Sequence, residues 1–215
     1  MSNHFHKEWN QPSLKVFGTG MLQVRPDVAE LESGVVTEAA DALTAQEENA
    51  IIMNRLYQAL LSIPITQENI QTIEYSIYPQ YDYQDGNPVL KGYQVTNRLS
   101  IRVTDLAQTG LIIDTAVQNG ANHISNIVFT LSDDHRYYRQ ALQLAIQNAY
   151  QKAQTMTQTI RVQLFPVPFH ITELMPSRPQ PFQAYSLKAS NATTPIEPGQ
   201  IEIEANIEMK FTYYC

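Results

Sequence analysis

The densest group of polar side chains with catalytic potential is the run Ser132-Asp133-Asp134-His135-Arg136-Tyr137. An acid–base enzyme would pair the imidazole of His135 with the carboxylate of Asp133 or Asp134. Adjacent residues at a helix start point in different directions around the axis, which is a poor geometry for such a pair. A serine or aspartate here instead predicts a cap that accepts hydrogen bonds from free backbone amides. We therefore interpret the run as a helix cap, with His135 solvated in the first turn, and predict no enzymatic activity.

The second group is aromatic and surrounds one expected hairpin: Tyr75, Tyr78, Tyr81, Tyr83 and Tyr93. Tyrosine combines a wide apolar ring with a polar tip, so it suits cores, subunit interfaces and ligand-stacking surfaces. Cross-strand packing within one chain and contact between two subunits explain the cluster equally well. A platform for a small aromatic ligand is the third alternative.

Motifs for metals and cofactors are missing from the sequence. His4 and His6 supply only two ligands, too few for a structural metal site. The pattern Gly18-Thr19-Gly20 lacks the third glycine and the following helix of a dinucleotide fingerprint. We predict neither a metal nor a nucleotide cofactor.

The overall charge argues against a nucleic-acid partner. The formal net charge is −7 and the isoelectric point is near 5.2, whereas nucleic-acid binding needs clustered lysine and arginine. No stretch approaches the roughly 20 apolar residues of a membrane-spanning helix. The first ten residues contain no signal-peptide core, and the single cysteine is Cys215. We expect a cytoplasmic chain, or an exported one if a leader has been removed.

Hydrophobic periodicity gives an order of strands and helices. The expected helices begin at Asp41 or Thr44 and end before Pro64, then span 106–119 and 133–159. A bend or bulge at Gly18-Thr19-Gly20 is expected to divide the first strand. The expected strands are 14–18, 21–24, 28–37, 71–83, 89–104, 122–131, 162–175 and 201–213.

The last strand shows the clearest pattern in the chain. Apolar residues at 201, 203, 205, 207, 209, 211 and 213 alternate with polar ones after a Pro-Gly turn, so one face of this strand is expected to lie under a helix. We predict an α+β protein with an antiparallel or mixed sheet, helices packed on one face, and a β-α-β-β order that could occur twice. Residues 1–13 are expected to be a flexible leader and residues 14–215 a single domain, with a proline-rich arm at 176–199.

An ordered set of short segments resembles the SIMPL domain family, a family of unknown function that includes bacterial periplasmic immunogenic proteins and oxidative-stress-associated proteins. The matching segments are Val16-Phe17-Gly18-Thr19-Gly20, Pro26-Asp27-Val28-Ala29, Ile77-Tyr78-Pro79-Gln80-Tyr81, Gly92-Tyr93-Gln94-Val95-Thr96-Asn97, Gly120-Ala121, Ile127-Val128-Phe129-Thr130-Leu131-Ser132-Asp133, the alanine-rich helix and Pro195-Ile196-Glu197-Pro198-Gly199. The resemblance implies an α+β fold, large homo-oligomers and no established enzymatic chemistry.

We therefore expect a non-enzymatic, self-assembling bacterial protein with a stress-related or scaffolding role. The expected interface comprises Tyr78, Tyr81, Tyr83, Tyr93, Phe182, Tyr185 and Leu187. The alternative is a module that binds a peptide or small ligand with the tyrosine-rich hairpin and the proline-rich arm.

Overall fold

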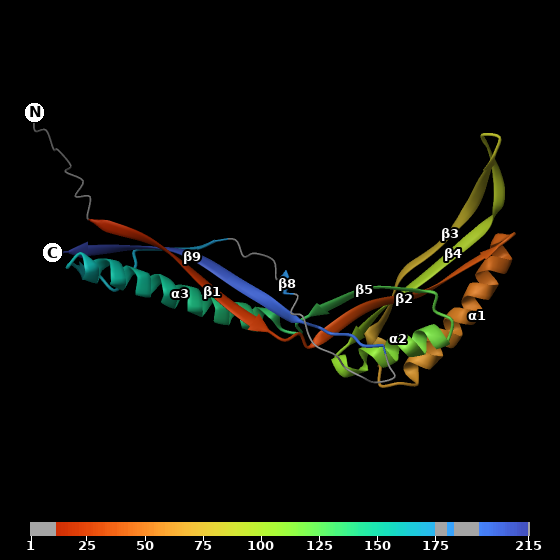
Figure 1. Cartoon of the computed structure of the whole chain (residues 1–215), viewed down its shortest axis with the longest axis horizontal. Helices are drawn as coiled ribbons and strands as arrows, with labels where there is room; N and C mark the ends of the chain where they lie inside the picture. Colours follow the sequence, from red (N-terminus) through yellow and green to blue (C-terminus); the bar gives the residue numbers. More distant parts are fainter. Residues whose placement is uncertain (1–11, 175–179, 183–193, 215) are drawn as a thin grey trace, which may run out of the picture. The chain divides into compact units, whose positions relative to one another are not determined.

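The computed structural model describes residues 12–174, 180–182 and 194–214. These residues form two compact units, each with antiparallel strands and helices on one sheet face (Figure 1). The predicted α+β class is confirmed. The expected leader and most of the expected arm, at residues 1–11, 175–179 and 183–193, lie outside the described residues. The single domain expected over residues 14–215 stays a prediction.

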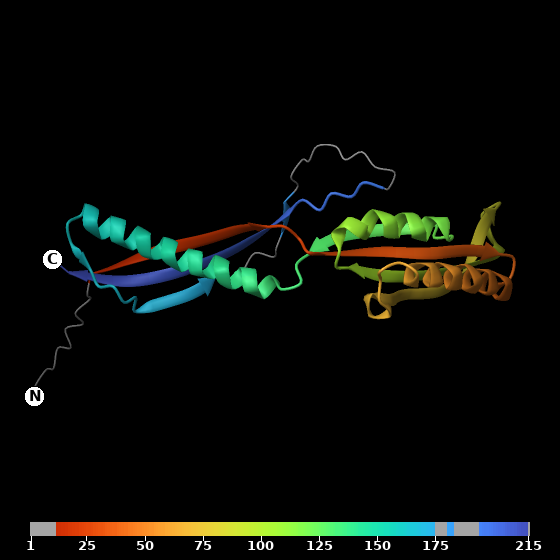
Figure 2. The same cartoon turned by 90° about the horizontal axis from the view of Figure 1, so that it is seen from below.

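Unit 1 is built around two long strands. Strands β1 (Ser13–Val24) and β9 (Gln200–Tyr214) pair along their whole length, from Ser13↔Thr212 to Val24↔Ile201. Helix α3 (Asp134–Thr159) lies across one face of this pair (Figure 2). Strands β6 (Gln163–Leu164), β7 (His170–Leu174) and β8 (Gln180–Phe182) pair in turn with the other edge of β9. Among the described residues, β9 is therefore central and β1 is an edge strand.

The predicted two-faced character of β9 is confirmed. Its apolar residues Ile203, Ile207 and Phe211 are buried, whereas the alternating polar residues are partly exposed. The facing side of α3 is a stripe of buried alanines at 141, 145, 149 and 153. Small side chains let the helix backbone approach the sheet closely, which is why the sequence places alanine there.

The expected bend at Gly18-Thr19-Gly20 is wrong. Strand β1 runs through these residues without interruption, and neither glycine has a positive φ. A Cβ on Gly18 or Gly20 would overlap a carbonyl oxygen of α3. The glycines are needed for close helix packing and not for a change of chain direction.

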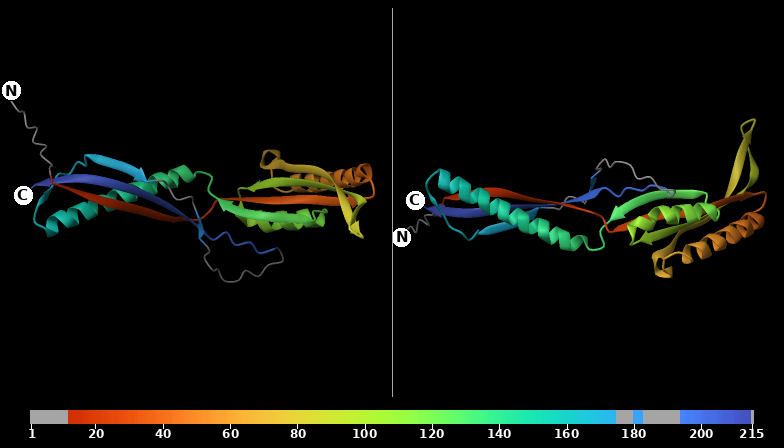
Figure 3. Two further views of the ribbon diagram at one scale, coloured as in Figure 1. Left: turned by 90° about the horizontal axis from the view of Figure 1, so that it is seen from above. Right: turned by 60° about the horizontal axis from the view of Figure 1, so that its bottom comes forward.

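Unit 2 has a four-stranded sheet, counted over the described residues, in the order β3-β4-β2-β5 (Figure 3). Its strands are β2 (Val28–Ala39), β3 (Ile70–Gln84), β4 (Asn87–Val103) and β5 (His123–Thr130). Helices α1 (Ala42–Leu61) and α2 (Thr109–Gln118), preceded by the short 3-10 turn Leu106–Gln108, pack on one face, and a second turn at Gln67–Asn69 precedes β3. The core between helices and sheet includes Leu31, Val35, Leu56, Leu60 and Ile101.

Local signals position these elements as predicted. The Asp41 carboxylate accepts a hydrogen bond from the Thr44 amide and caps α1. Asp85 and Gly86 form the hairpin turn with φ values of 51° and 82°, the left-handed conformations that a tight two-residue turn requires. Gly120 follows α2 with φ of 101°.

The described end of the arm belongs to unit 2. The Thr194 hydroxyl donates to Asp114 of α2 at 2.6 Å, and Ile196 packs against the unit 2 core. These contacts place Thr194 and Ile196 on the helical side of the unit. None of the described helices has the length and apolar character needed to cross a membrane.

Candidate functional site

A projecting hairpin, residues 78–93, is the most exposed aromatic feature of unit 2. The last pair between β2 and β4 is Ala39↔Tyr93. Beyond it, β3 and β4 pair only with each other among the described strands, from Pro79↔Tyr93 to Gln84↔Asn87. The hairpin therefore extends past the end of the four-stranded sheet (Figure 1).

Three of the four tyrosines in the predicted interface carry rings in solvent, and Tyr75, the fifth tyrosine of the predicted aromatic group, is also exposed, on the part of β3 before the projecting hairpin. Tyr78, Tyr81 and Tyr83 are 61%, 54% and 72% exposed. Strand alternation places Tyr81 and Tyr83 on one face and Tyr78 on the opposite face. The three rings thus do not form one flat stacking platform. The hairpin offers apolar surface on both sides, which suits a partner that wraps around it.

The fourth tyrosine, Tyr93, is partly buried at the base of the hairpin. It lines a small pocket of about 230 Å³ together with Glu38, Gln80, Lys91 and Gly92. A Cβ on Gly92 would overlap the carbonyl oxygen of Ala39, so the glycine permits this close approach. The pocket offers one carboxylate, one ammonium group and one phenol. The carboxylate is already held by the side-chain amide of Gln94 at 2.8 Å.

The arm residues of the predicted interface are not tested. Phe182 lies in β8, paired with Gln200, but its side chain is outside the described part. Tyr185 and Leu187 lie outside the described residues altogether, as do His4 and His6.

A second polar cluster, missed by the sequence reading, lies on the sheet face opposite the helices of unit 2. Arg98 of β4 donates to Glu32 of β2 at 3.1 Å and also to Glu74 of β3. Its Nη1 atom is 3.5 Å from Nε2 of His123 on β5. All four strands of the sheet therefore contribute to one network.

Gly34 makes this arrangement sterically possible. It pairs with Arg98 on one side and His123 on the other, and a Cβ at this position would meet the Arg98 side chain at 2.8 Å. The sequence shows Arg98 only near Arg102, and His123 as isolated. Only the register of β4 and β5 against β2 brings Arg98 and His123 together.

The electrostatics of the network are those of a structural ion-pair cluster. The hydrogen bond from Arg98 lowers the pKa of Glu74, with smaller contributions from Ser76 and from the charge of His123, while burial acts in the opposite direction. A carboxylate stabilised in this way stays ionised and is a weak base. The cluster therefore ties strands together more readily than it moves protons.

The Ser125 hydroxyl lies 3.0 Å from Nε2 of His123, which is a nucleophile–base distance. The acid of the group, Glu32, contacts Ser125 at 3.4 Å and Asn126 at 3.0 Å. In a hydrolase triad the acid instead holds the histidine. This arrangement does not reproduce the order of groups that activates a serine.

The predicted cap at the start of α3 is confirmed. Asp133 accepts a hydrogen bond from the Arg136 amide at 2.9 Å, and His135 is exposed. Ser132 has another role: its amide and hydroxyl both donate to Asp27, at 2.7 and 2.6 Å.

Within the described part of the chain, no group of three or more histidine, cysteine, aspartate or glutamate residues could hold a metal ion.

Comparison with known proteins defines the class. A family model described as "SIMPL: Protein of unknown function (DUF541)" matches residues 14–211. The chain therefore belongs to the SIMPL family, and the predicted resemblance is confirmed. The family description assigns no reaction to its members.

Individual relatives match most of the chain. The 26 kDa periplasmic immunogenic protein of Brucella melitensis is 29% identical over 213 residues, which cover 94% of this chain and 85% of the relative. The uncharacterized protein YggE of Escherichia coli is 25% identical over 203 residues, which cover 93% of this chain and 82% of the relative.

The name of the Brucella relative contradicts the expected cytoplasmic location. That expectation rested on the absence of an apolar leader in the first residues, whereas the relative over almost the whole chain is named a periplasmic protein. Composition and charge are compatible with either compartment, and the first residues of the given sequence do not decide between them.

Proposed function

We propose that this SIMPL protein is a non-enzymatic, self-assembling protein with a scaffolding role, and that the projecting hairpin is its main subunit contact. The observation that carries the proposal is the exposure of Tyr78, Tyr81 and Tyr83 on a two-stranded extension of the sheet. Val89 and Leu90, on the second strand of the hairpin, are also exposed. Tyrosines are enriched in protein interfaces, where the ring is buried and the hydroxyl stays paired.

A two-stranded extension gains little stability from its own contacts. An isolated hairpin is marginally stable in water because it has no sheet face to bury. Contact with a second copy covers both faces of the hairpin and orders the tyrosine side chains. This supports an assembly role over a ligand platform, because the exposed rings lie on two opposite faces.

The arm is the second contact that we propose, through Phe182, Tyr185 and Leu187. Proline-rich segments have few internal hydrogen bonds, so they gain order by packing against another surface. The described ends of the arm are held, at β8 by β9 and at Thr194 by Asp114. A change confined to residues 183–193 therefore leaves both anchored ends in place.

The proposed location is the periplasm, supported by the name of the Brucella relative. A stress-related role rests on the family resemblance alone and adds no residue to the proposal.

The native mass in solution tests the assembly. We expect light scattering after size exclusion to give a multiple of the 24.4 kDa chain mass, and the double variant Tyr81→Ser/Tyr83→Ser to reduce it. Tyr214→Ser is the matched control, because Tyr214 is 53% exposed but lies in unit 1. An intact chain that stays monomeric at high concentration contradicts the proposal.

The alternative function is capture of a small ligand in the pocket at the hairpin base, favoured by the charged groups Glu38 and Lys91 that line it. In that case the chain is a monomer, and Lys91→Gln weakens ligand binding without changing the native mass. Assembly instead predicts an oligomer for the unaltered chain, whose mass falls in Tyr81→Ser/Tyr83→Ser and stays unchanged in Lys91→Gln, because Lys91→Gln leaves the exposed tyrosines intact.

A further inference from the structure

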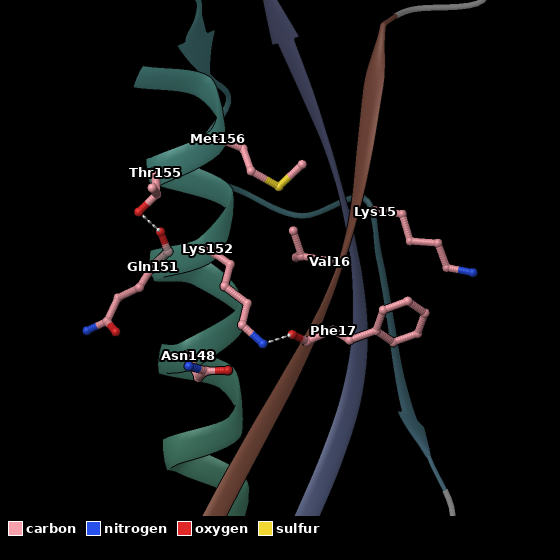
Figure 4. A pocket seen from close by; sticks show the side chains of 8 residues that line it. All are labelled: Lys15, Val16, Phe17, Asn148, Gln151, Lys152, Thr155 and Met156. Atoms are coloured by element: carbon pink, nitrogen blue, oxygen red, sulfur yellow. Dashed lines mark hydrogen bonds between the residues drawn. The ribbon is translucent and has the colours of Figure 1, made fainter. Parts of the chain in front are cut away.

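A groove in unit 1 separates the outer edge of β1 from the second half of α3. It has a volume of about 590 Å³ and is lined by Lys15, Val16, Phe17, Asn148, Gln151, Lys152, Thr155 and Met156 (Figure 4). The groove opens just beyond Gly18, where the close approach of the helix ends and the Val16 side chain takes up the space between the two elements.

Backbone groups of β1 face this groove. The Phe17 carbonyl accepts a hydrogen bond from Nζ of Lys152 at 2.8 Å, and the Thr19 amide donates to the Asn148 side chain at 3.2 Å. The N–H and C=O of one strand residue point to the same side, so both groups of Phe17 and of Thr19 face away from β9. No described strand pairs with this edge.

Lys152 and Asn148 replace a neighbouring strand only in part. Lys152 binds the Phe17 carbonyl and Asn148 binds the Thr19 amide. The Phe17 amide and the Thr19 carbonyl face the same side of the strand. An exposed edge of this kind is a template for pairing with another chain. Extended peptides bind to such edges, with backbone hydrogen bonds giving affinity and adjoining pockets accepting alternate side chains.

We propose that this groove binds an extended peptide segment, which adds to β1 as a further strand and carries an acidic group beside Lys152. The backbone of the incoming segment takes over the bonds made by Lys152 and Asn148 to Phe17 and Thr19. Its alternate side chains contact Val16 and Met156 on the apolar side of the groove.

Charge complementarity selects the acidic group. Lysines 15 and 152 are the charged residues among the described groove lining, and no carboxylate is among them. Lys15 points away from the helix and pairs with Glu208 at 2.6 Å. Lys152 is thus the ammonium group directed into the groove, and it needs a new partner once the peptide backbone takes its place at Phe17.

The test uses a synthetic probe. It is an N-acetylated peptide in which three valines alternate with three threonines, followed by a C-terminal glutamate. We expect the probe to shift the Phe17 and Thr19 amide resonances of the full chain and to slow their hydrogen exchange. Phe17→Pro removes the outward amide at a position where an edge strand tolerates proline. It should abolish the probe-induced shift of the Thr19 amide at unchanged melting temperature. Met21→Pro is the matched control, on the same edge but outside the groove.

A second pair of variants covers the case in which proline disturbs the strand. Gln151→Trp fills the groove from the exposed surface of α3 and should block the probe, whereas Gln147→Trp, exposed on the same helix outside the lining, should not. Lys152→Met should weaken the acidic probe roughly threefold, the size of an exposed ion pair, and should not weaken a probe with glutamine in place of glutamate.

Three results overturn the proposal. The first is the absence of amide shifts at millimolar probe concentration. The second is equal binding by Phe17→Pro, Gln151→Trp and their controls. The third is a dimer that Phe17→Pro dissociates, which assigns the edge to a second copy of the chain and not to a peptide.

Discussion

Gly18 of β1 lies so close to Ala145 of α3 that a Cβ atom on the glycine would overlap the carbonyl oxygen of the alanine. Gly20, the next residue of β1 on the helix-facing side, has the same relationship to the carbonyl oxygen of Ala141. The glycine pair and the alanine stripe are therefore two halves of one contact. The position of α3 on the sheet therefore depends on the lack of side chains at Gly18 and Gly20 as well as on the small alanine side chains of the helix.

Replacing Gly18 with alanine should destabilise unit 1 by roughly 1–3 kcal/mol, because a backbone oxygen cannot move aside as a flexible side chain can. The measurement is denaturant unfolding followed by far-ultraviolet circular dichroism. Met21→Ala is the control, since Met21 lies on the opposite face of the strand and is 58% exposed. Equal stability of Gly18→Ala and wild type would mean that α3 can shift without loss.

Ile207→Asp should unfold unit 1. Ile207 is fully buried on the helix-facing side of β9, and an unpaired carboxylate there loses its hydration without gaining a partner. Thr212→Asp, on the open face of the same strand, should remain folded. A soluble Ile207→Asp protein with unchanged melting would show that the two faces of β9 have been assigned wrongly.

Much of this architecture could be predicted from local sequence signals. Alternation identified β9, Asp85-Gly86 identified the hairpin turn, and Asp133 identified the start of α3, because each depends only on neighbouring residues. The role of Gly18 could not be read in this way, since a glycine that bends a strand and one that admits a helix look identical in sequence.

The polar network of unit 2 could not be predicted either, because its residues are far apart in the sequence. Arg98 and Glu32 are 66 positions apart, and their contact depends on the register of β2 against β4. The buried Asn49 was also missed, because it interrupts the apolar stripe of α1 with a polar residue whose partners are on two different strands.

Asn49→Leu should lower the free energy of unfolding of unit 2 by about 1–3 kcal/mol. The Asn49 side-chain amide donates to the carbonyl oxygens of Val35 and Val95, at 3.0 and 3.3 Å. Leucine leaves both buried carbonyls without this donor. Chemical denaturation gives the value, and Glu48→Leu, at the neighbouring exposed position, is the control. A stabilised Asn49→Leu protein would show that packing outweighs the two hydrogen bonds.

Stability should fall in acid, beginning below about pH 4.5. Hydrogen bonds from Lys15 first and Lys210 second lower the pKa of Glu208 from its usual 4.5, and Arg98 lowers that of Glu74. A carboxylate with a lowered folded-state pKa contributes stability above its unfolded pKa and loses it as the pH falls through the folded value. Melting temperatures from pH 7 to pH 3 measure the loss. Glu208→Gln should show a shallower decline, and an identical decline would assign the acid sensitivity to other carboxylates.

The last prediction distinguishes a helix-capping role from a catalytic role for the residues at the start of α3. Asp133→Ala should cost about 1 kcal/mol of stability, because the Arg136 amide loses its acceptor at the helix end. His135→Ala should leave both melting and native mass unchanged, since this exposed side chain fills no core position. The two variants alter residues only two positions apart, so each serves as the control for the other in the same unfolding and light-scattering experiments. Loss of a defined catalytic activity in a fully folded His135→Ala protein would reverse the assignment and make the imidazole a functional group.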